Sequence, residues 1–408
     1  MVNLVDLPTE LLHTIFSNIH GENVTLNNIC LVGNRTLLAI ARPLTFREIN
    51  IALSLPLTES HRFYSKFRSV YSNKNRRDSV KSISFRCSGF PDIKMSEILV
   101  KQLPRFAGVT HASVECEYDH LNDDGTCLST ILIPIIFKMP ALESFSISAC
   151  GLDDNAFSLD YSRPFLKHVR FDCVCSGPIL EYAHVEGVQI IEARGDYEDY
   201  TIMQTLDGIS SLSEPQQHLL NHLDLRSTPD PSDQLGIDMA QWFAELPAGS
   251  FPNLEVLVIL IPIYHMFLGA ILENLSVGKL KKLCIGRVSV WDTIRYVPTL
   301  PPMDDFTSLE ETLLLYNGYE DSVISNLTKA PRLTHIHFFG DIDADYMGKA
   351  RTYGELVETL RTVSWVNRAT IGLERDDKGD IVHTEARDYE EPAWFEFGTA
   401  ADGWRGKD

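Results

Sequence analysis

The chain has 408 residues, 44% of them hydrophobic and 23% charged, so it can bury a sizeable core and is not a wholly disordered protein. Its formal net charge is −20, but residues 1–110 hold 14 Lys and Arg against 8 Asp and Glu, a net of +6, and the remainder carries −26. The acidic bulk of the molecule repels nucleic acid and favours basic partners, so we expect no nucleic-acid partner.

A helix is predicted over residues 8–19, in the stretch LPTELLHTIFSNI. Pro8 suits the first helical position, because its missing N–H is one that no helix satisfies there, and Glu10 lies at the positive end of the helix dipole. This helix is too apolar on one face for open water, so we expect that face to dock against the rest of the chain or against another protein. Its apolar residues are Leu11, Leu12, Ile15, Phe16 and Ile19.

Two further short helices are predicted before residue 45. Thr25 is the expected N-cap of the second helix, and Pro43 is expected to close the third. The following LTFREINI is predicted to be extended. Three short helices within about forty residues cannot bury all of their apolar surface among themselves, so part of it needs an outside partner. The apolar positions are Leu26, Ile29, Cys30 and Val32 in the second helix and Leu37, Leu38, Ile40 and Ala41 in the third.

The segments LPTELLHTIF, ICLVGNRTLLAIARPL and FREI, over residues 4–49, resemble an F-box of the fungal type. The F-box is a three-helix module that docks onto the Skp adaptor of cullin-RING ubiquitin ligases. The chain departs from many F-boxes in having no tryptophan before Trp242, and Phe46 stands near the exit position. The resemblance implies that an apolar groove of the adaptor receives Leu7, Pro8, Leu11, Ile15, Phe16, Leu26, Leu31 and Val32.

Two interpretations of this apolar face remain open. In the first, helix-in-groove docking onto the adaptor explains apolar anchors at this spacing. In the second, the face packs onto the segments behind it as an ordinary N-terminal cap.

A linking segment follows at residues 51–79. Its stretch TESHRFYSKFRSVYSN predicts an amphipathic helix with Phe63, Phe67, Val70 and Tyr71 on one face. The basic cluster KNRR behind it is either a nuclear address or a solvated turn after a helix, and the second interpretation is the more common case.

From Val80 onward the sequence repeats the pattern apolar-x-x-apolar-x-apolar at an average spacing of 28 residues. The alternation is typical of a strand with one buried face, and 28 residues leave room for a return helix. Stacked units of this kind form a solenoid with a parallel sheet, and they resemble the irregular leucine-rich repeats found behind F-boxes. The alternative is a non-repeating α/β domain. The copies start at Val80, Val109, Leu142, Leu166, Val185, Leu220, Leu254, Leu280, Leu309 (degraded), Leu333 and Leu360.

Four copies carry proline two places before the leucine: MPALESFSI, RPFLKHVRF, FPNLEVLVI and APRLTHIHF. We expect each proline to end the preceding helix and to release an extended strand. The Asn or Cys that usually follows the strand in such repeats is mostly missing, Cys150 being the clearest case in register. Since the copies are also spaced from 19 to 35 residues apart, we expect uneven turns between them.

The stretch from Val256 to Leu272 contains no formal charge. It is short for a membrane span, it contains Pro262 and His265, and it is flanked by carboxylates. We therefore predict a buried strand followed by a buried helix, and no membrane partner.

The end of the chain departs from the repeat pattern. RATIGLERDDKGDIVHTE predicts a hairpin with its turn at residues 377–379, which would seal the last open sheet edge. The tail behind it is acidic with interleaved aromatic residues. It is either disordered, or Trp394, Phe395 and Phe397 dock on the last repeats.

No catalytic or metal-binding signature is convincing. A phosphate loop, a GxSxG elbow and a Walker motif are all missing. His218 and His222 have helical spacing but lack the glutamate of a zincin, and His335 with His337 has no carboxylate or cysteine at ligand spacing. The acidic residues at 341–345 lack the later glycine and glutamate of a calcium loop. We therefore expect no enzyme, no cofactor and no metal.

The eight cysteines contain no CxxC pair. Cys173 and Cys175 are separated by one residue, and we expect buried thiols in a reducing compartment instead of disulfides or a zinc site. No basic region followed by an apolar core opens the sequence, so we expect a cytoplasmic or nuclear protein.

The sequence thus predicts an α/β chain with an F-box at residues 1–50, a linking helix at 51–79, an irregular leucine-rich-repeat solenoid at 80–366 and a capping hairpin with an acidic aromatic tail at 367–408. The resemblance implies a substrate-recognition subunit of a Skp–cullin–F-box ligase. Its partners would be the adaptor, through it a cullin, and an unidentified target held by the repeats. The alternative is a non-degradative interaction scaffold.

Overall fold

Contacts within the chain divide the computed structural model into two compact units, Met1–Glu186 (unit 1) and Gly187–Asp408 (unit 2). The residues that the structure describes are 7–17, 23–32, 34–52, 67–68, 70–87, 99, 101–116, 128–148, 166–172, 187–195, 200–227, 233–261, 269, 271–286, 303–315, 320–338, 345–366, 368–389, 392 and 394–395.

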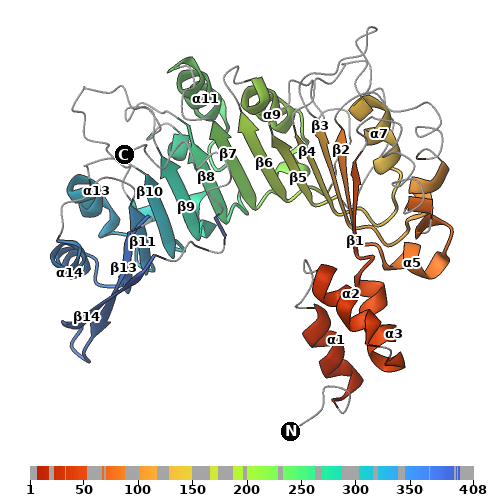
Figure 1. Cartoon of the computed structure of the whole chain (residues 1–408). Helices are drawn as coiled ribbons and strands as arrows, with labels where there is room; N and C mark the ends of the chain where they lie inside the picture. The colour runs from red at the N-terminus through yellow and green to blue at the C-terminus, as the bar shows by residue number, and fades with distance from the viewer. Residues whose placement is uncertain are drawn as a thin grey trace. The chain divides into compact units, whose positions relative to one another are not determined.

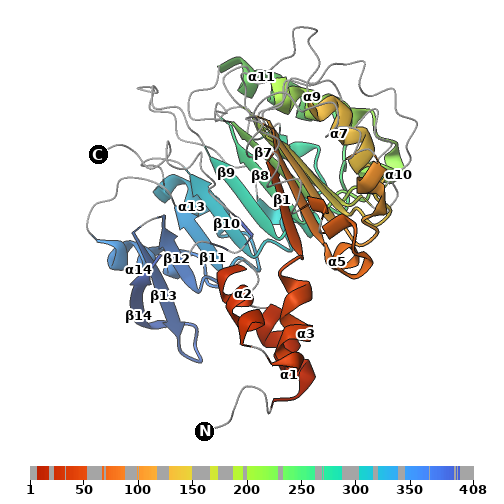
Figure 2. The ribbon, with the colours of Figure 1, turned by 45° about the vertical axis from the view of Figure 1, so that its right-hand side comes forward.

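Three helices open unit 1 (Figure 2): α1 Thr9–Ser17, α2 Asn23–Leu31 and α3 Arg35–Leu44. They lie where the sequence predicts helices, with shifted ends. The N–H of Leu12 donates to the carbonyl oxygen of Pro8 at 3.1 Å, so Pro8 precedes α1 instead of occupying its first position. Helix α2 begins before the predicted cap Thr25, and α3 ends one residue beyond Pro43.

The three helices enclose a small core of their own. Oδ1 of Asn34 accepts from the N–H groups of Thr36 at 2.9 Å and Leu37 at 3.1 Å, which satisfies two donors at the start of α3. We call residues 7–44 the three-helix module. Its buried core consists of Leu12, Phe16, Leu26, Leu37, Ile40 and Ala41, with Leu7, Ile29, Cys30 and Leu44 partly buried against it.

The linking segment is described from residue 67. Residues 67–68 and 70–71 are helical, and Phe67 and Val70 are buried, which agrees with the predicted amphipathic helix; Phe63 lies outside the described residues. The Phe67 ring stacks on Phe106 with its centroid 6.0 Å away. The basic cluster forms a short helix, α5 Lys74–Ser79, and not the solvated turn that we predicted.

In the described residues of unit 1, five parallel strands form a sheet (Figure 1): β1 Glu48–Ala52, β2 Ser82–Cys87, β3 His111–Cys116, β4 Ser144–Ser148 and β5 His168–Asp172. Strand β1 lies in the extended exit of the three-helix module and pairs with β2. Its residues Phe46, Ile49 and Ile51 have the spacing of a repeat copy. The repeats therefore begin one copy earlier than predicted.

The part of unit 2 that the structure describes contains seven parallel strands and an antiparallel pair (Figure 1). The parallel strands are β6 Ile190–Gly195, β7 His222–Ser227, β8 Val256–Leu260, β9 Lys282–Gly286, β10 Glu311–Leu315, β11 His335–Phe338 and β12 Thr362–Trp365. The antiparallel pair is β13 Ala369–Arg375 and β14 Ile381–Asp388. The mixed α/β class and the long, mostly parallel sheet agree with the prediction.

The repeat pattern fixes the strand positions. Each strand from β2 to β12 begins two residues after the first apolar residue of its copy, and the three apolar positions of each copy are buried. One predicted copy was wrong: β6 follows Val188 and not Val185, and Val188, Ile191 and Ala193 are the buried residues. The step from Leu166 is therefore 22 residues instead of 19.

The prolines before the leucines stand in turns. The N–H of Leu254 donates to the carbonyl oxygen of Phe251 at 3.0 Å, and that of Leu333 donates to Ala330 at 3.4 Å. These bonds close four-residue turns with proline in the second position, which its fixed φ angle favours. The N–H of Val109 closes the same turn on Phe106 without proline, so the proline reinforces a turn that a copy without it also makes. Pro164 and Cys150 lie outside the described residues.

The connections between strands contain helices of unequal length. Buried residues such as Phe243 and Leu206 show that these helices cover one face of the sheet in unit 2, on the side where Figure 1 shows α9 and α11. The unequal lengths agree with the expected irregularity of the repeats. The helices are α7 Leu128–Ile136, α9 Tyr200–Ser210, α10 Glu214–Gln217, α11 Asp233–Glu245, α13 Glu320–Leu327 and α14 Tyr346–Leu356, with the short 3₁₀ helices η2 Leu103–Arg105, η4 Val277–Lys279 and η5 Met303–Asp305.

The uncharged stretch after Glu255 forms a strand first, as predicted. Strand β8 is buried on both faces apart from Val256, and residues 269 and 271–273 are helical with Ile271 and Leu272 buried. Within the described parts of the chain, no helix has the length and apolar character needed to cross a bilayer.

The predicted C-terminal hairpin is present. Strand β13 pairs antiparallel with β12 and with β14, so it covers the edge of the last parallel strand. The turn holds Gly379 at a φ of 90°, and Oδ1 of Asp376 accepts from the N–H groups of Lys378 at 2.9 Å and Asp380 at 3.0 Å. The glycine is required because an L-residue is disfavoured in this region.

Candidate functional site

The three-helix module exposes apolar side chains that its core does not need. Leu11 and Ile15 lie four residues apart on α1 and are 51% and 37% exposed, and Val32 after α2 is 69% exposed. Pro8 is exposed, and Leu7 is half-buried against the module core. Leu11 and Ile15 are therefore open to solvent in this structure.

Two of the predicted adaptor-binding residues have another role here. Phe16 and Leu26 are 1% exposed and lie in the core of the module. In this structure they support the exposed residues and do not offer a surface themselves. The side chain of Leu31 and the whole of Ile19 lie outside what the structure describes.

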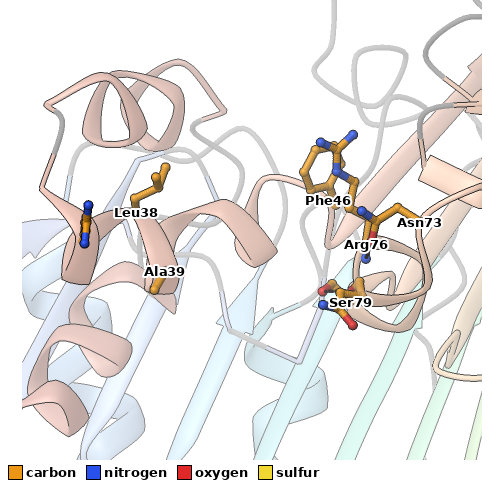
Figure 3. Close-up of a pocket in the computed structure, with 8 residues that line it drawn as sticks. Leu38, Ala39, Phe46, Asn73, Arg76 and Ser79 are labelled. Carbon is orange, nitrogen blue, oxygen red and sulfur yellow. Dashed lines mark hydrogen bonds between the residues drawn. The ribbon is translucent and has the colours of Figure 1, made fainter.

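A shallow pocket of about 420 Å³ lies between α3 and α5 (Figure 3). Leu38 and Ala39 form one side, and Arg76 stands on the other side with its guanidinium 5.0 Å from the Phe46 ring centroid. A cation–π contact of this kind holds α5 against the exit of the module. The remaining lining residues are Arg35, Asn73, Asn75 and Ser79.

A second surface lies in unit 2, on the face of the sheet opposite to the covering helices. In unit 1 the corresponding strand positions are small and polar, for example Ser113 and Ser146, and burial alternates along β4 and β5. In unit 2 these positions become Val258, Cys284 and Leu313, and β8 and β9 are buried on both faces. Something must therefore cover this face.

The cover is the C-terminal segment, by which we mean Tyr389, Pro392, Trp394 and Phe395. Phe395 is 1% exposed, and Tyr389 and Trp394 pack beside it. Of the two alternatives for the tail, disorder and docking, Trp394 and Phe395 follow the second; Phe397 lies outside the described residues. We call the covered surface the tail-covered face, and its apolar members are Val258, Leu260, Cys284, Leu313 and Val366.

Glu311 is the centre of a polar cluster on this face. Its Oε2 accepts from the indole N–H of Trp394 at 2.7 Å and from Nζ of Lys282 at 3.0 Å, and Oε1 lies 2.9 Å from Nε2 of His337. Burial alone would raise the pKa of Glu311, but the hydrogen bonds from His337 and Lys282 outweigh it and lower the pKa to about 2. The carboxylate is therefore ionised at neutral pH.

A buried ion pair lies under Phe395 of the segment. Nε of Arg226 donates to Oδ1 of Asp224 at 2.6 Å, and Nη2 donates to Oδ2. The guanidinium carbon stands 4.4 Å from the ring centroid of Phe395. Burial alone would lower the pKa of Arg226, but the Asp224 carboxylate outweighs it and raises the pKa, so the guanidinium stays charged. Such a bidentate pair under an aromatic ring gives geometric specificity.

Cys284 lies in the apolar part of the same face. Burial raises the pKa of its thiol well above the usual value, so it remains protonated. Neither Cys284 nor Cys30 forms a disulfide bond. Cys173 and Cys175 lie outside the described residues.

Sequence spacing missed the Glu311–His337 contact. His335 and His337 indeed share a strand face, but their carboxylate comes from β10, where Glu311 is in register with His335. In the described residues no group of three His, Cys, Asp or Glu side chains is placed to hold a metal ion. The parallel pairing of β10 with β11 brings Glu311 and His337 together, and residue spacing along the sequence does not show that pairing.

The other residues considered for chemistry have structural positions. His218 ends α10 and His222 begins β7, so they do not share a helix. Asp345, the described member of the acidic cluster, caps α14 by accepting from the N–H of Gly348 at 2.8 Å.

No protein-family model matches the chain, and no curated protein matches it.

Proposed function

We propose that this protein is a substrate-recognition subunit of a Skp–cullin–F-box ubiquitin ligase. In this proposal the three-helix module binds the Skp adaptor and, through it, a cullin, while the repeats bind a target protein. The observation that carries the proposal is the exposure of Leu11 and Ile15 on a helix whose inner face already fills the module core. Exposed apolar residues at this spacing are the anchors of helix-in-groove docking.

The energetic contribution of this surface is sizeable. Burying a leucine or isoleucine side chain that was exposed gives about 1.5–3 kcal/mol, and Leu11 and Ile15 are each part-exposed, so each contributes about half of that. Val32 and Pro8 add to the apolar area. Phe16 and Leu26 contribute indirectly, because they fix the orientation of α1 and α2.

A receptor of this kind performs no bond chemistry. It raises the effective concentration of a target lysine near a charged ubiquitin carrier and orients it. This role is consistent with a chain whose described residues form a three-helix module and a long sheet.

Affinity purification of the full chain from cells treated with a proteasome inhibitor tests the proposal. Wild type should recover adaptor and cullin, and Leu11→Asp with Ile15→Asp should reduce recovery of both at least tenfold. The matched control is Leu356→Asp, because Leu356 at the end of α14 is 49% exposed, close to the 51% of Leu11. Failure of wild type to recover the adaptor would overturn the proposal, and recovery of adaptor without cullin would favour a non-degradative scaffold.

A further inference from the structure

The C-terminal segment covers charged side chains as well as apolar ones. Beneath Trp394 and Phe395 lie Glu311 and the Asp224–Arg226 pair, whose two side chains are 4% and 9% exposed. Removing such charges from water costs several kcal/mol per ion, and an apolar patch of the same shape is often as stable or more so. A face that only had to be sealed would not need them. Charges are useful on a face that is sometimes open to water or that recognises a polar ligand.

The segment contacts the face through side chains. A backbone hydrogen bond within the segment runs from the N–H of Phe395 to the carbonyl oxygen of Pro392 at 2.9 Å. The anchors are the indole N–H on Glu311, the Trp394 ring with Nζ of Lys282 5.3 Å from its centroid, and the buried Phe395 ring. A few aromatic anchors in desolvated pockets are what carries affinity in protein–peptide recognition.

The face also retains a polar atom that the segment does not satisfy. Nδ1 of His337 is buried and makes no hydrogen bond within the described structure, and the side chain is 6% exposed. Its Nε2 is engaged by Glu311, and the Tyr389 ring stands edge-on with its centroid 6.2 Å away. A buried polar atom of this kind calls for a functional explanation.

We propose that the tail-covered face is the peptide-binding surface of the repeats and that the C-terminal segment occupies it as an internal ligand. The partner that fits is a segment of another protein with a proline-led turn followed by adjacent Trp and Phe side chains, the Trp supplying an N–H to Glu311. The inference rests on the proposed function in taking the repeats as the target-binding part, but it does not require adaptor binding.

The C-terminal segment and the partner's segment compete for the same face, but only the first is covalently connected to it. A segment tethered to its own site has an effective concentration in the millimolar range, so it excludes a weaker partner and yields to a tighter one. A free peptide should therefore bind wild type much more weakly than a chain whose own anchors have been removed.

The test uses the full chain with Trp394→Ala and Phe395→Ala, together with a fluorescent synthetic peptide of the chain's own residues 387–397, RDYEEPAWFEF. Fluorescence anisotropy should show the peptide binding the double variant at least tenfold more tightly than wild type. A peptide with both aromatic residues changed to alanine should not bind, and adding Glu311→Gln to the double variant should weaken binding several-fold.

Alkylation of Cys284, mapped by mass spectrometry, reports whether the face is open, with Cys30 in the other unit as the internal reference. The double variant should label Cys284 faster than wild type, and the peptide should slow that labelling. Fast labelling without peptide binding would overturn the proposal. If the double variant loses its circular dichroism spectrum, Trp394→Phe replaces it, and unchanged labelling together with unchanged peptide affinity would overturn the proposal equally.

These results are separable from adaptor binding. The peptide assay contains no adaptor, and Leu11→Asp should leave peptide affinity unchanged. If the chain binds the peptide but does not recover the adaptor, the peptide-binding proposal is supported and the ligase proposal is refuted. If it recovers the adaptor but does not bind the peptide, the ligase proposal is supported and the peptide-binding proposal is refuted.

Discussion

The indole N–H of Trp394 donates a 2.7 Å hydrogen bond to Oε2 of Glu311, which lies 83 residues earlier in the chain. This bond joins the C-terminal segment to strand β10, and the same carboxylate accepts from Lys282 on β9. A single carboxylate thus connects two neighbouring strands with the segment that covers them. The stability of this arrangement depends on the donor and on the charge of the acceptor.

Changing Trp394 to phenylalanine should destabilise unit 2. The substitution keeps an aromatic ring but removes the donor to an ionised acceptor, and hydrogen bonds to charged groups contribute about 1.5–3 kcal/mol. Because part of the ring area is also lost, we expect a loss of about 2 kcal/mol in the free energy of unfolding, measured by urea titration. Trp242→Phe is the matched control, since its indole donates to the neutral hydroxyl of Ser210 at 2.9 Å. A loss in the Trp242 variant equal to that of Trp394→Phe would contradict the account.

Acid should weaken unit 2 through Glu311. The pKa of this group is lowered to about 2 in the folded chain, so its stabilising contribution is present in full above its unfolded pKa of about 4.5 and is lost as the pH falls from there towards 2. Its charged and titratable neighbours are Lys282, His337 and His335. The contribution lost between pH 6 and pH 3.5 is about 1 kcal/mol after allowance for solvent screening.

The comparison that isolates this effect uses Glu311→Gln, which keeps an acceptor and removes the titration. Urea unfolding at pH 6 and at pH 3.5 should show a smaller acid-induced loss in the variant than in wild type. Equal losses in the two proteins would mean that other carboxylates account for the acid sensitivity.

The strands could be predicted because the three repeat positions of each copy are buried. In the copy at Leu254, the buried residues Leu254, Leu257 and Ile259 have a spacing that is visible in the sequence. The copy before Leu220 was ambiguous, because Val185 and Val188 both begin an acceptable pattern. Only the pairing of Ile190 with His222 decides between them.

The tail-covered face could be predicted only in part. The adjacent aromatic residues Trp394 and Phe395 indicated a docking segment, but nothing in the sequence indicated Glu311 as the acceptor. That contact depends on the register of β10 with its neighbours, which is set by pairing between residues far apart in the chain. The exposure of Leu11 beside the burial of Leu12 likewise depends on how the three helices pack, beyond the apolar stripe itself.

Thr312 offers a substitution that should stabilise the protein. It occupies the middle apolar position of the degraded copy at Leu309, it is 0% exposed, and its hydroxyl makes no hydrogen bond within the described structure. An unsatisfied buried hydroxyl costs about 1–3 kcal/mol, and valine has nearly the same shape. Thr312→Val should therefore raise the free energy of unfolding by about 1 kcal/mol, measured by urea titration.

The control for this prediction is another buried threonine. The hydroxyl of Thr205 donates to the carbonyl oxygen of Thr201 at 2.6 Å, so Thr205→Val removes a hydrogen bond that is made. That variant should be less stable than wild type by about 0.5–1.5 kcal/mol. If both valine variants shifted the unfolding midpoint in the same direction, the stability change would not depend on whether the buried hydroxyl makes a hydrogen bond.

Gly379→Ala should destabilise the terminal hairpin through backbone conformation alone. The residue has a φ of 90°, and a Cβ placed on it would meet no atom within 4 Å, so no steric clash with neighbouring groups contributes. An L-residue held in this left-handed region costs about 1–2 kcal/mol. Gly278→Ala is the control, because its backbone lies outside that region and its nearest neighbour would be Oγ1 of Thr307 at 3.9 Å. Because alanine lowers the conformational entropy of the unfolded chain, Gly278→Ala should be neutral or slightly stabilising. The thermal unfolding midpoint should therefore fall in Gly379→Ala and stay the same or rise slightly in Gly278→Ala, and an equal loss in both would mean that glycine at the turn is not required for its positive φ.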